Sequence, residues 1–211
     1  MATATTADAT NRGLRGLADR ANPAFAAAVV VVPIAALATA TTMQNLIALT
    51  YVHVMAAVLW TGIDLFMGAV LGPVLGGTSP ETRSRFFRKF TPKMTFLMPS
   101  IAVVTIAGGI VLAQWLGQFP NAAPWLALLT LATLAPVVAL VGYQFDALTD
   151  RRTLGVLSVV VVGSLAWLWS TLDQLVLLNH WILAALGIVT LLSVLGFGVL
   201  LPGEVRIFRE I

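Results

Sequence analysis

Six long apolar stretches, each nearly free of charge, restrict the fold of this chain more than any other feature. They cover residues 25–43, 46–75, 94–116, 125–148, 154–172 and 180–201. About 20 mostly apolar residues are enough for an α-helix to cross the hydrocarbon core of a bilayer. Only 10% of the 211 residues are charged, whereas a soluble domain carries roughly a quarter. The sequence therefore predicts an all-α, polytopic membrane helix bundle with about six transmembrane helices.

The distribution of Lys and Arg predicts the orientation of these helices. If the N-terminus is inside, the inner segments are the N-terminal tail, the connections after the second and fourth stretches, and the C-terminus. All twelve cationic residues fall in these segments: Arg12, Arg15, Arg20, Arg83, Arg85, Arg88, Lys89, Lys93, Arg151, Arg152, Arg206 and Arg209. The outer connections hold none, as the positive-inside rule requires. We predict that both termini face the cytoplasm of a prokaryote, with residues 1–23 as a polar tail and 24–211 as the transmembrane bundle.

Tryptophan positions agree with this orientation, because Trp collects at membrane–water interfaces. Five of the six tryptophans fall near the outer ends of the apolar stretches: Trp115, Trp125, Trp167, Trp169 and Trp181. The basic segment 83–93 contains interleaved phenylalanines. This pattern favours an amphipathic segment that lies on the anionic inner leaflet, rather than a nucleic-acid site.

The first apolar stretch has an alternative interpretation as a secretory signal. Arginines precede it, and both Ala36-Leu37-Ala38 and Ala38-Thr39-Ala40 resemble a small-residue cleavage site. Cleavage would leave five spans and would not change the orientation of the others. We expect a retained anchor instead, in which Pro33 can kink the helix.

Few ionisable residues lie at membrane depth, where their cost makes them candidates for function. They are His53 and Asp64 in the second stretch, Asp146 near the inner end of the fourth, and His180 at the start of the sixth. Both histidines of the chain therefore fall in the outer part of the membrane. For Asp146, nearby polar residues favour a structural network at the interface.

A polar stripe is predicted along one face of the second helix. His53, Trp60, Asp64 and Met67 follow steps of seven, four and three residues, so they share a face. Lipid offers His and Asp no partner, and the stripe should therefore face the bundle interior. Gly68 continues near this face, where it would let a helix or a flat cofactor approach closely.

The two histidines have three possible roles. Two imidazoles from different helices are the ligand set of a six-coordinate b-type haem, so His53 and His180 are candidate haem ligands, with Trp60 and Gly68 beside them. The same pair could bind copper as a metal site, helped by a thioether. Alternatively, His53 hydrogen-bonds a neighbouring helix and His180 faces water. Asp64 is either on an ion or proton path or in a structural hydrogen bond.

Haem propionates would need amide partners, because the outer connections hold no Arg or Lys. The candidates are Gln44, Asn45, Gln114, Gln118, Gln174 and Asn179. The chain also has no cysteine, which excludes disulfides, iron–sulfur clusters and c-type haem attachment. No phosphate-binding loop or catalytic triad pattern is found, and the sequence does not decide whether the chain is an enzyme.

Residues 46–116 resemble a known group of proteins. The positions that carry the resemblance are His53, Trp60-Thr61-Gly62, Phe66, Pro73, Pro99 and Gly108. This pattern resembles the small multi-span membrane proteins grouped around the copper-resistance D membrane domain and the J-type protoporphyrinogen oxidase. The resemblance implies that the helix-borne histidine, here His53, takes part in haem or copper handling. The oxidase would be expected to carry a Lys in a later span, and this chain has none after Lys93.

Three functional hypotheses follow. The first is a small integral membrane redox protein or respiratory-type subunit that binds a b-type haem near the outer membrane face. The second is a copper or other cation transport protein whose path passes His53 and Asp64. The third is a non-catalytic accessory subunit of a larger membrane complex. The expected partners are the lipid bilayer and other membrane subunits or a second copy, and not nucleic acid.

Overall fold

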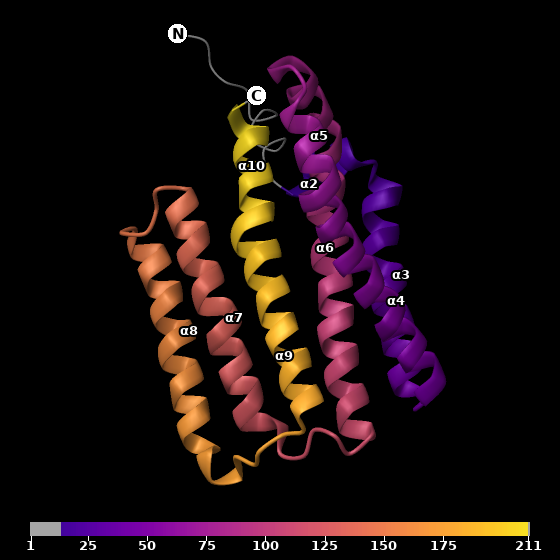
Figure 1. Ribbon diagram of the computed structural model, residues 1–211, viewed down its shortest axis with the longest axis vertical. Helices are drawn as coiled ribbons and strands as arrows, with labels where there is room; N and C mark the ends of the chain where they lie inside the picture. Colours follow the sequence, from indigo (N-terminus) through magenta and orange to yellow (C-terminus); the bar gives the residue numbers. More distant parts are fainter. Residues whose placement is uncertain (1–13, 211) are drawn as a thin grey trace. The chain divides into compact units, whose positions relative to one another are not determined.

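The computed structural model describes residues 14–210, and these form helices without any strand (Figure 1). Residues 1–13 of the predicted tail, including Arg12, lie outside the described residues. The elements are α2 (Leu14–Ala21), α3 (Pro23–Thr42), α4 (Leu46–Leu65), η1 (Phe66–Leu71), α5 (Gly72–Gly76), α6 (Pro80–Trp115), α7 (Ala122–Gln144), α8 (Arg151–Ser170), η2 (Leu172–Gln174), α9 (His180–Ser193), η3 (Val194–Leu200) and α10 (Leu201–Glu210).

Six helices of the described chain are long and apolar enough to cross a membrane. They are Pro23–Thr42, Leu46–Gly76, Pro80–Trp115, Ala122–Gln144, Arg151–Ser170 and His180–Arg206. Each overlaps one of the six apolar stretches, so the prediction of an all-α bundle with six spans is confirmed. The chain is therefore a multi-pass protein of a lipid bilayer. The orientation of its termini stays a prediction.

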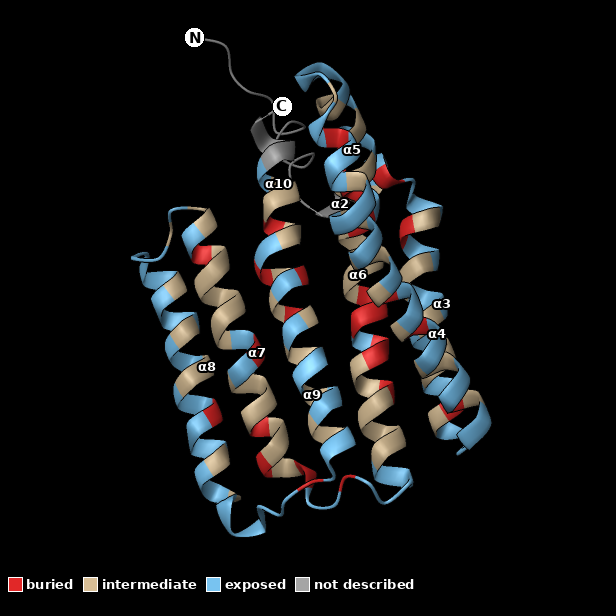
Figure 2. Ribbon diagram, in the orientation of Figure 1, coloured by how far each residue is buried: buried red, intermediate tan, exposed pale blue. Residues whose placement is uncertain are grey.

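The spans differ in how much of their surface faces other parts of the protein. In the apolar part of α6, 39% of the residues are buried, against 6% in α8. Figure 2 shows the same contrast, with buried residues along α6 and a largely exposed α8. Exposed apolar side chains at bilayer depth contact lipid, so α8 is a lipid-facing helix.

The basic segment 83–93 does not form a separate surface segment as predicted. It is the first part of α6, a single helix of 36 residues. At 1.5 Å per residue such a helix is about 54 Å long, well beyond the roughly 30 Å of hydrocarbon. The cationic end of α6 therefore continues the axis of the span out of the membrane. The helix continues past the last of these charges, although Pro92 and Pro99 inside it each lack the N–H of the helical hydrogen-bond ladder.

Arg83 stabilises the turn that precedes this extension. Its guanidinium group donates to the carbonyls of Leu75, Gly76 and Thr78 at 3.2, 3.3 and 3.4 Å. The Leu75 and Gly76 carbonyls lie at the end of α5, where a helix leaves acceptors without intrahelical partners, and the Thr78 carbonyl lies in the turn that follows. Farther along α6, the rings of Phe86 and Phe90 stack at 4.9 Å, one helical turn apart.

The chain divides into two compact units, Met1–Gly108 with Ile207–Ile211, and Gly109–Arg206. In the first unit, α3 and α4 pack together and join through a tight turn in which Gln44 has a φ of 50°. The Asn45 side chain caps α4 by accepting a hydrogen bond from the Ala48 N–H at 3.0 Å. This cap starts the second span at the residue where its apolar stretch begins.

In the second unit, α7 packs against both α8 and η3 (Figure 1). Glycines allow this close approach, as is typical of helix contacts in membranes. A Cβ atom at Gly142 would lie 2.9 Å from Thr153 Cγ2, and one at Gly198 would lie 2.9 Å from Leu140 Cδ1. A hydrogen bond from the Trp125 indole to the Val176 carbonyl, at 2.9 Å, joins the start of α7 to the connection between α8 and α9.

Both π-helical segments come just before a proline. Pro73 follows η1 and Pro202 follows η3. Proline has no N–H to donate and its ring clashes with the carbonyl four residues earlier, and a wider turn relieves that clash. In η3 that carbonyl belongs to Gly198, and it accepts a hydrogen bond from Gln144 Nε2 at 2.7 Å. A side chain of α7 thus replaces the donor that Pro202 lacks.

The Gly198 contact gives a first test of the packing in this unit. We expect Gly198→Leu to lower the unfolding free energy by about 1–3 kcal/mol, because the added side chain overpacks against Leu140. Gly187→Leu is the matched control, since a Cβ there meets nothing within 4 Å. Unfolding in mixed detergent micelles, followed by circular dichroism, measures both variants. Equal stability of the two would contradict the close α7–η3 contact.

Candidate functional site

His53 is held by a hydrogen bond between two helices of the first unit. Its Nδ1 atom lies 2.9 Å from the backbone carbonyl oxygen of Thr105 on α6. A carbonyl can only accept, so Nδ1 carries the proton and donates it. In the neutral imidazole, Nε2 is then left with a lone pair. The expected hydrogen bond between His53 and a neighbouring helix is therefore present, and Nε2 takes no part in it.

Small side chains allow the helices to approach at this point. A Cβ atom on Gly108 would lie 3.4 Å from both His53 Cβ and Leu37 Cδ1, so α3, α4 and α6 meet there. The Thr105 hydroxyl donates to the Ile101 carbonyl at 2.8 Å within its own helix. It therefore does not compete for the imidazole, and the ring orientation is determined by the backbone of α6.

The predicted polar stripe on α4 faces the protein. Trp60 is only 1% exposed, and His53, Asp64 and Met67 are partly buried. By contrast, Val58, which lies between His53 and Trp60 in the sequence, is 64% exposed. The orientation of the stripe is confirmed by these values. What the stripe binds stays a prediction.

Asp64 lies one turn below Trp60 and combines two features. One is its position, four residues after the buried Trp60 on the same face of α4. The other feature is Oδ2, which is buried and has no hydrogen-bond partner among the described residues. Eleven residues separate His53 from Asp64, about 16 Å along a helix axis. The two side chains therefore cannot bind the same ion.

The remaining predicted site residues lie in different surroundings. His180 is exposed at the first position of α9, with its ring centroid 4.8 Å from that of Trp181. It belongs to the second unit, whereas His53 belongs to the first. Gly68 is exposed in η1, and a Cβ there would meet nothing within 4 Å among the described residues. Asp146 lies in the connection after α7, with a φ of 53°.

Residues that sequence reasoning did not single out complete the site. Thr105 contributes only its backbone carbonyl, which every residue type possesses, so no sequence signal could have identified it. In the part of the chain that the structure describes, no group of three or more His, Cys, Asp or Glu could hold a metal ion.

Comparisons with protein-family models, curated proteins and solved structures give no match to this chain. The resemblance of residues 46–116 to the copper-resistance D grouping thus stays a prediction. Function must be argued from the geometry around His53.

Proposed function

We propose that this protein is a small redox protein or respiratory-type subunit of a prokaryotic cytoplasmic membrane that binds a b-type haem through His53. The observation that carries the proposal is the 2.9 Å hydrogen bond from Nδ1 to the Thr105 carbonyl. Histidines that bind metals almost always donate their other ring N–H to a carbonyl or carboxylate, which fixes the tautomer and the ring orientation. His53 has this arrangement.

The donor chemistry of the site fits a haem better than a free metal ion. A porphyrin supplies four iron ligands itself, so the protein needs to add only one or two axial side chains. A copper or cation site made from protein alone needs several donors around one ion, and the described residues contain no group of three or more His, Cys, Asp or Glu. This contrast favours the redox hypothesis over cation transport.

Each residue then has a defined role. His53 Nε2 binds the iron, and the α6 backbone at Thr105 orients the ring. The Asn45 Oδ1 atom is already used as a helix cap, but its amide N–H groups can donate to a propionate at the outer surface. A bound haem supplies one-electron transfer. His180 is exposed and belongs to the second unit, so its role as a haem ligand stays a prediction.

The test is a dithionite-reduced minus oxidised visible spectrum of the detergent-purified protein, with metal analysis of the same sample. We expect a sharp b-type α-band and a matching amount of iron. A flat spectrum from folded, monodisperse protein would refute the proposal. Copper in that sample would then support transport. The absence of any metal would support an accessory subunit whose His53 hydrogen bond only fixes helix packing.

A further inference from the structure

Asp64 lies at a depth where the membrane contains only hydrocarbon. It belongs to the apolar stretch 46–75, in which it and His53 are the only Asp, Glu, His, Lys or Arg. Asp64 comes eighteen residues after Leu46 and eleven before Leu75, which is about 27 Å and about 16 Å along a helix axis. The hydrocarbon core is only about 30 Å thick. Wherever the core falls along this stretch, Asp64 is therefore inside it.

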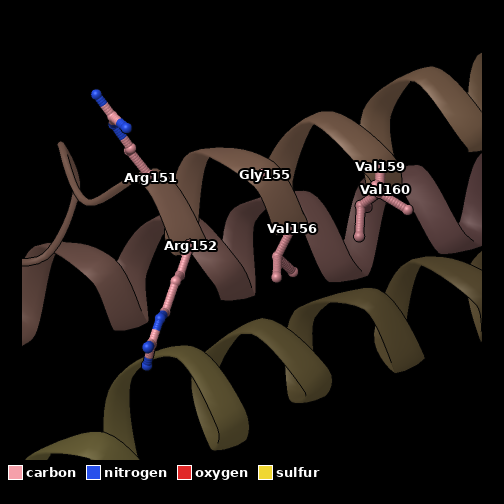
Figure 3. Close-up of a pocket in the computed structure, with 6 residues that line it drawn as sticks. All are labelled: Arg151, Arg152, Gly155, Val156, Val159 and Val160. Atoms are coloured by element: carbon pink, nitrogen blue, oxygen red, sulfur yellow. The ribbon is translucent and has the colours of Figure 1, made fainter.

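Charged side chains at the ends of the spans can reach water, and Asp64 cannot do so in the same way. At the start of α8, Arg151 and Arg152 are exposed and point to opposite sides of the helix (Figure 3). Long side chains of this kind extend from a helix end to the aqueous interface. The Asp side chain is short, so its carboxyl group stays close to the depth of its own backbone.

The neighbouring elements offer the Asp64 carboxyl no counter-charge. Its Oδ2 atom is buried without a hydrogen-bond partner among the described residues. The elements α3 and η1, which pack against α4, contain no Asp, Glu, His, Lys or Arg. On α6, the cation closest to the apolar part of the helix is Lys93. Its ammonium group lies 5.7 Å from the centroid of the Phe25 ring, and no ion pair joins it to Asp64 within the described chain.

The surface beside Asp64 is apolar as well. Asp64 is partly buried, and the two residues that follow it, Leu65 and Phe66, are 63% and 52% exposed. At this depth such side chains contact lipid. An unpaired carboxylate is far more costly to bury in apolar surroundings than a neutral hydroxyl group, so a carboxyl in this position is neutralised by a proton.

A proton fits this position better than a metal cation does. Hard cations need several oxygen ligands around them. In the part of the chain that the structure describes, no group of three or more His, Cys, Asp or Glu could supply such ligands. A proton needs only one carboxyl oxygen.

We propose that Asp64 is a proton-binding site within the membrane, where its carboxyl group is a neutral acid at neutral pH and is open to membrane-soluble carbodiimides. The inference does not rest on the proposed haem. In the reaction, the O–H proton moves to a nitrogen of the carbodiimide, and the carboxyl oxygen bonds to its central carbon. The acyl group then moves from that oxygen to the other nitrogen, which leaves a stable N-acylurea. Exclusion of water prevents hydrolysis of the reactive first adduct.

Carbodiimide labelling of the full-length protein in phosphatidylcholine liposomes tests this proposal. We expect dicyclohexylcarbodiimide to add once to each protein, and peptide mapping by mass spectrometry should locate the adduct at Asp64. The Asp64→Asn variant, which keeps the shape of the side chain, should lose the label, and Asp64→Glu should keep it. A water-soluble carbodiimide with an added amine is the matched control. It should modify the exposed Asp150 and Asp173 but not Asp64.

Infrared spectroscopy measures the proton itself. The wild-type protein should show the carbonyl stretching band of a protonated carboxyl group, and this band should be absent from Asp64→Asn. Circular dichroism checks that the variant retains its helices. Absence of such a band from the wild-type protein would overturn the proposal. Labelling that is unchanged in Asp64→Asn, or that maps to Glu204 near the end of the sixth span instead, would also overturn it.

Discussion

Replacing His53 with alanine is expected to remove the b-type haem spectrum from the purified protein. His53 is the residue of the site whose free lone pair is oriented by a hydrogen bond to the α6 backbone. Loss of a supporting hydrogen bond alone typically weakens metal binding by about 10–100-fold, and loss of the ligand itself should cost at least that much. The reduced minus oxidised spectrum, normalised to protein, measures the effect.

The His180→Ala variant is the matched comparison, because it removes the other histidine of the chain. Loss of the α-band in both variants would show that haem binding depends on both histidines. Loss in His53→Ala alone would exclude His180 as a ligand and leave it as an exposed residue whose ring lies beside that of Trp181. A His53→Ala protein that keeps its full haem content would exclude His53 as the ligand. Circular dichroism of each variant checks that the fold is retained.

Hydrophobicity predicted the number of spans because it reports directly where a helix can meet lipid. It did not predict the start of α6. Basic residues before Met94 suggested a separate surface segment, but backbone hydrogen bonds in a helix do not depend on side-chain charge. The helix therefore begins at Pro80. Patterns of charge locate the membrane boundary, whereas helix ends depend on caps and turns such as the one Arg83 stabilises.

The candidate site was only partly predictable. The spacing of His53, Trp60 and Asp64 predicted one shared face, because helical geometry alone determines that relation. The partner of His53 could not be predicted, since it is a backbone carbonyl on a helix 52 residues away in sequence. The π-helical turns have a local cause in Pro73 and Pro202. The hydrogen bond that the Gly198 carbonyl accepts from the Gln144 side chain could not be predicted either, because it depends on which helices are neighbours.

Replacing Trp60 with alanine is expected to cause the largest loss of stability among single substitutions in the first unit. Trp60 is the largest fully buried side chain of the described residues, at 1% exposure. Removal of a buried Trp side chain costs about 3–5 kcal/mol, because the surrounding atoms lose their contacts and a cavity remains. Within a bilayer, packing of this kind is a main source of helix association. Equilibrium unfolding in mixed micelles should show the decrease directly.

Two further variants show what Trp60 contributes. Trp60→Phe keeps most of the packing but removes the indole N–H, so its cost should be smaller than that of alanine. Trp169→Ala should change stability little, because Trp169 is 80% exposed. If Trp60→Ala were as stable as Trp169→Ala, the stripe on α4 could not be packed against the protein. One further outcome combines lower stability of Trp60→Ala with a haem spectrum retained by Trp60→Phe. In that case the indole N–H has a structural role, and haem binding depends on His53 and the packed ring.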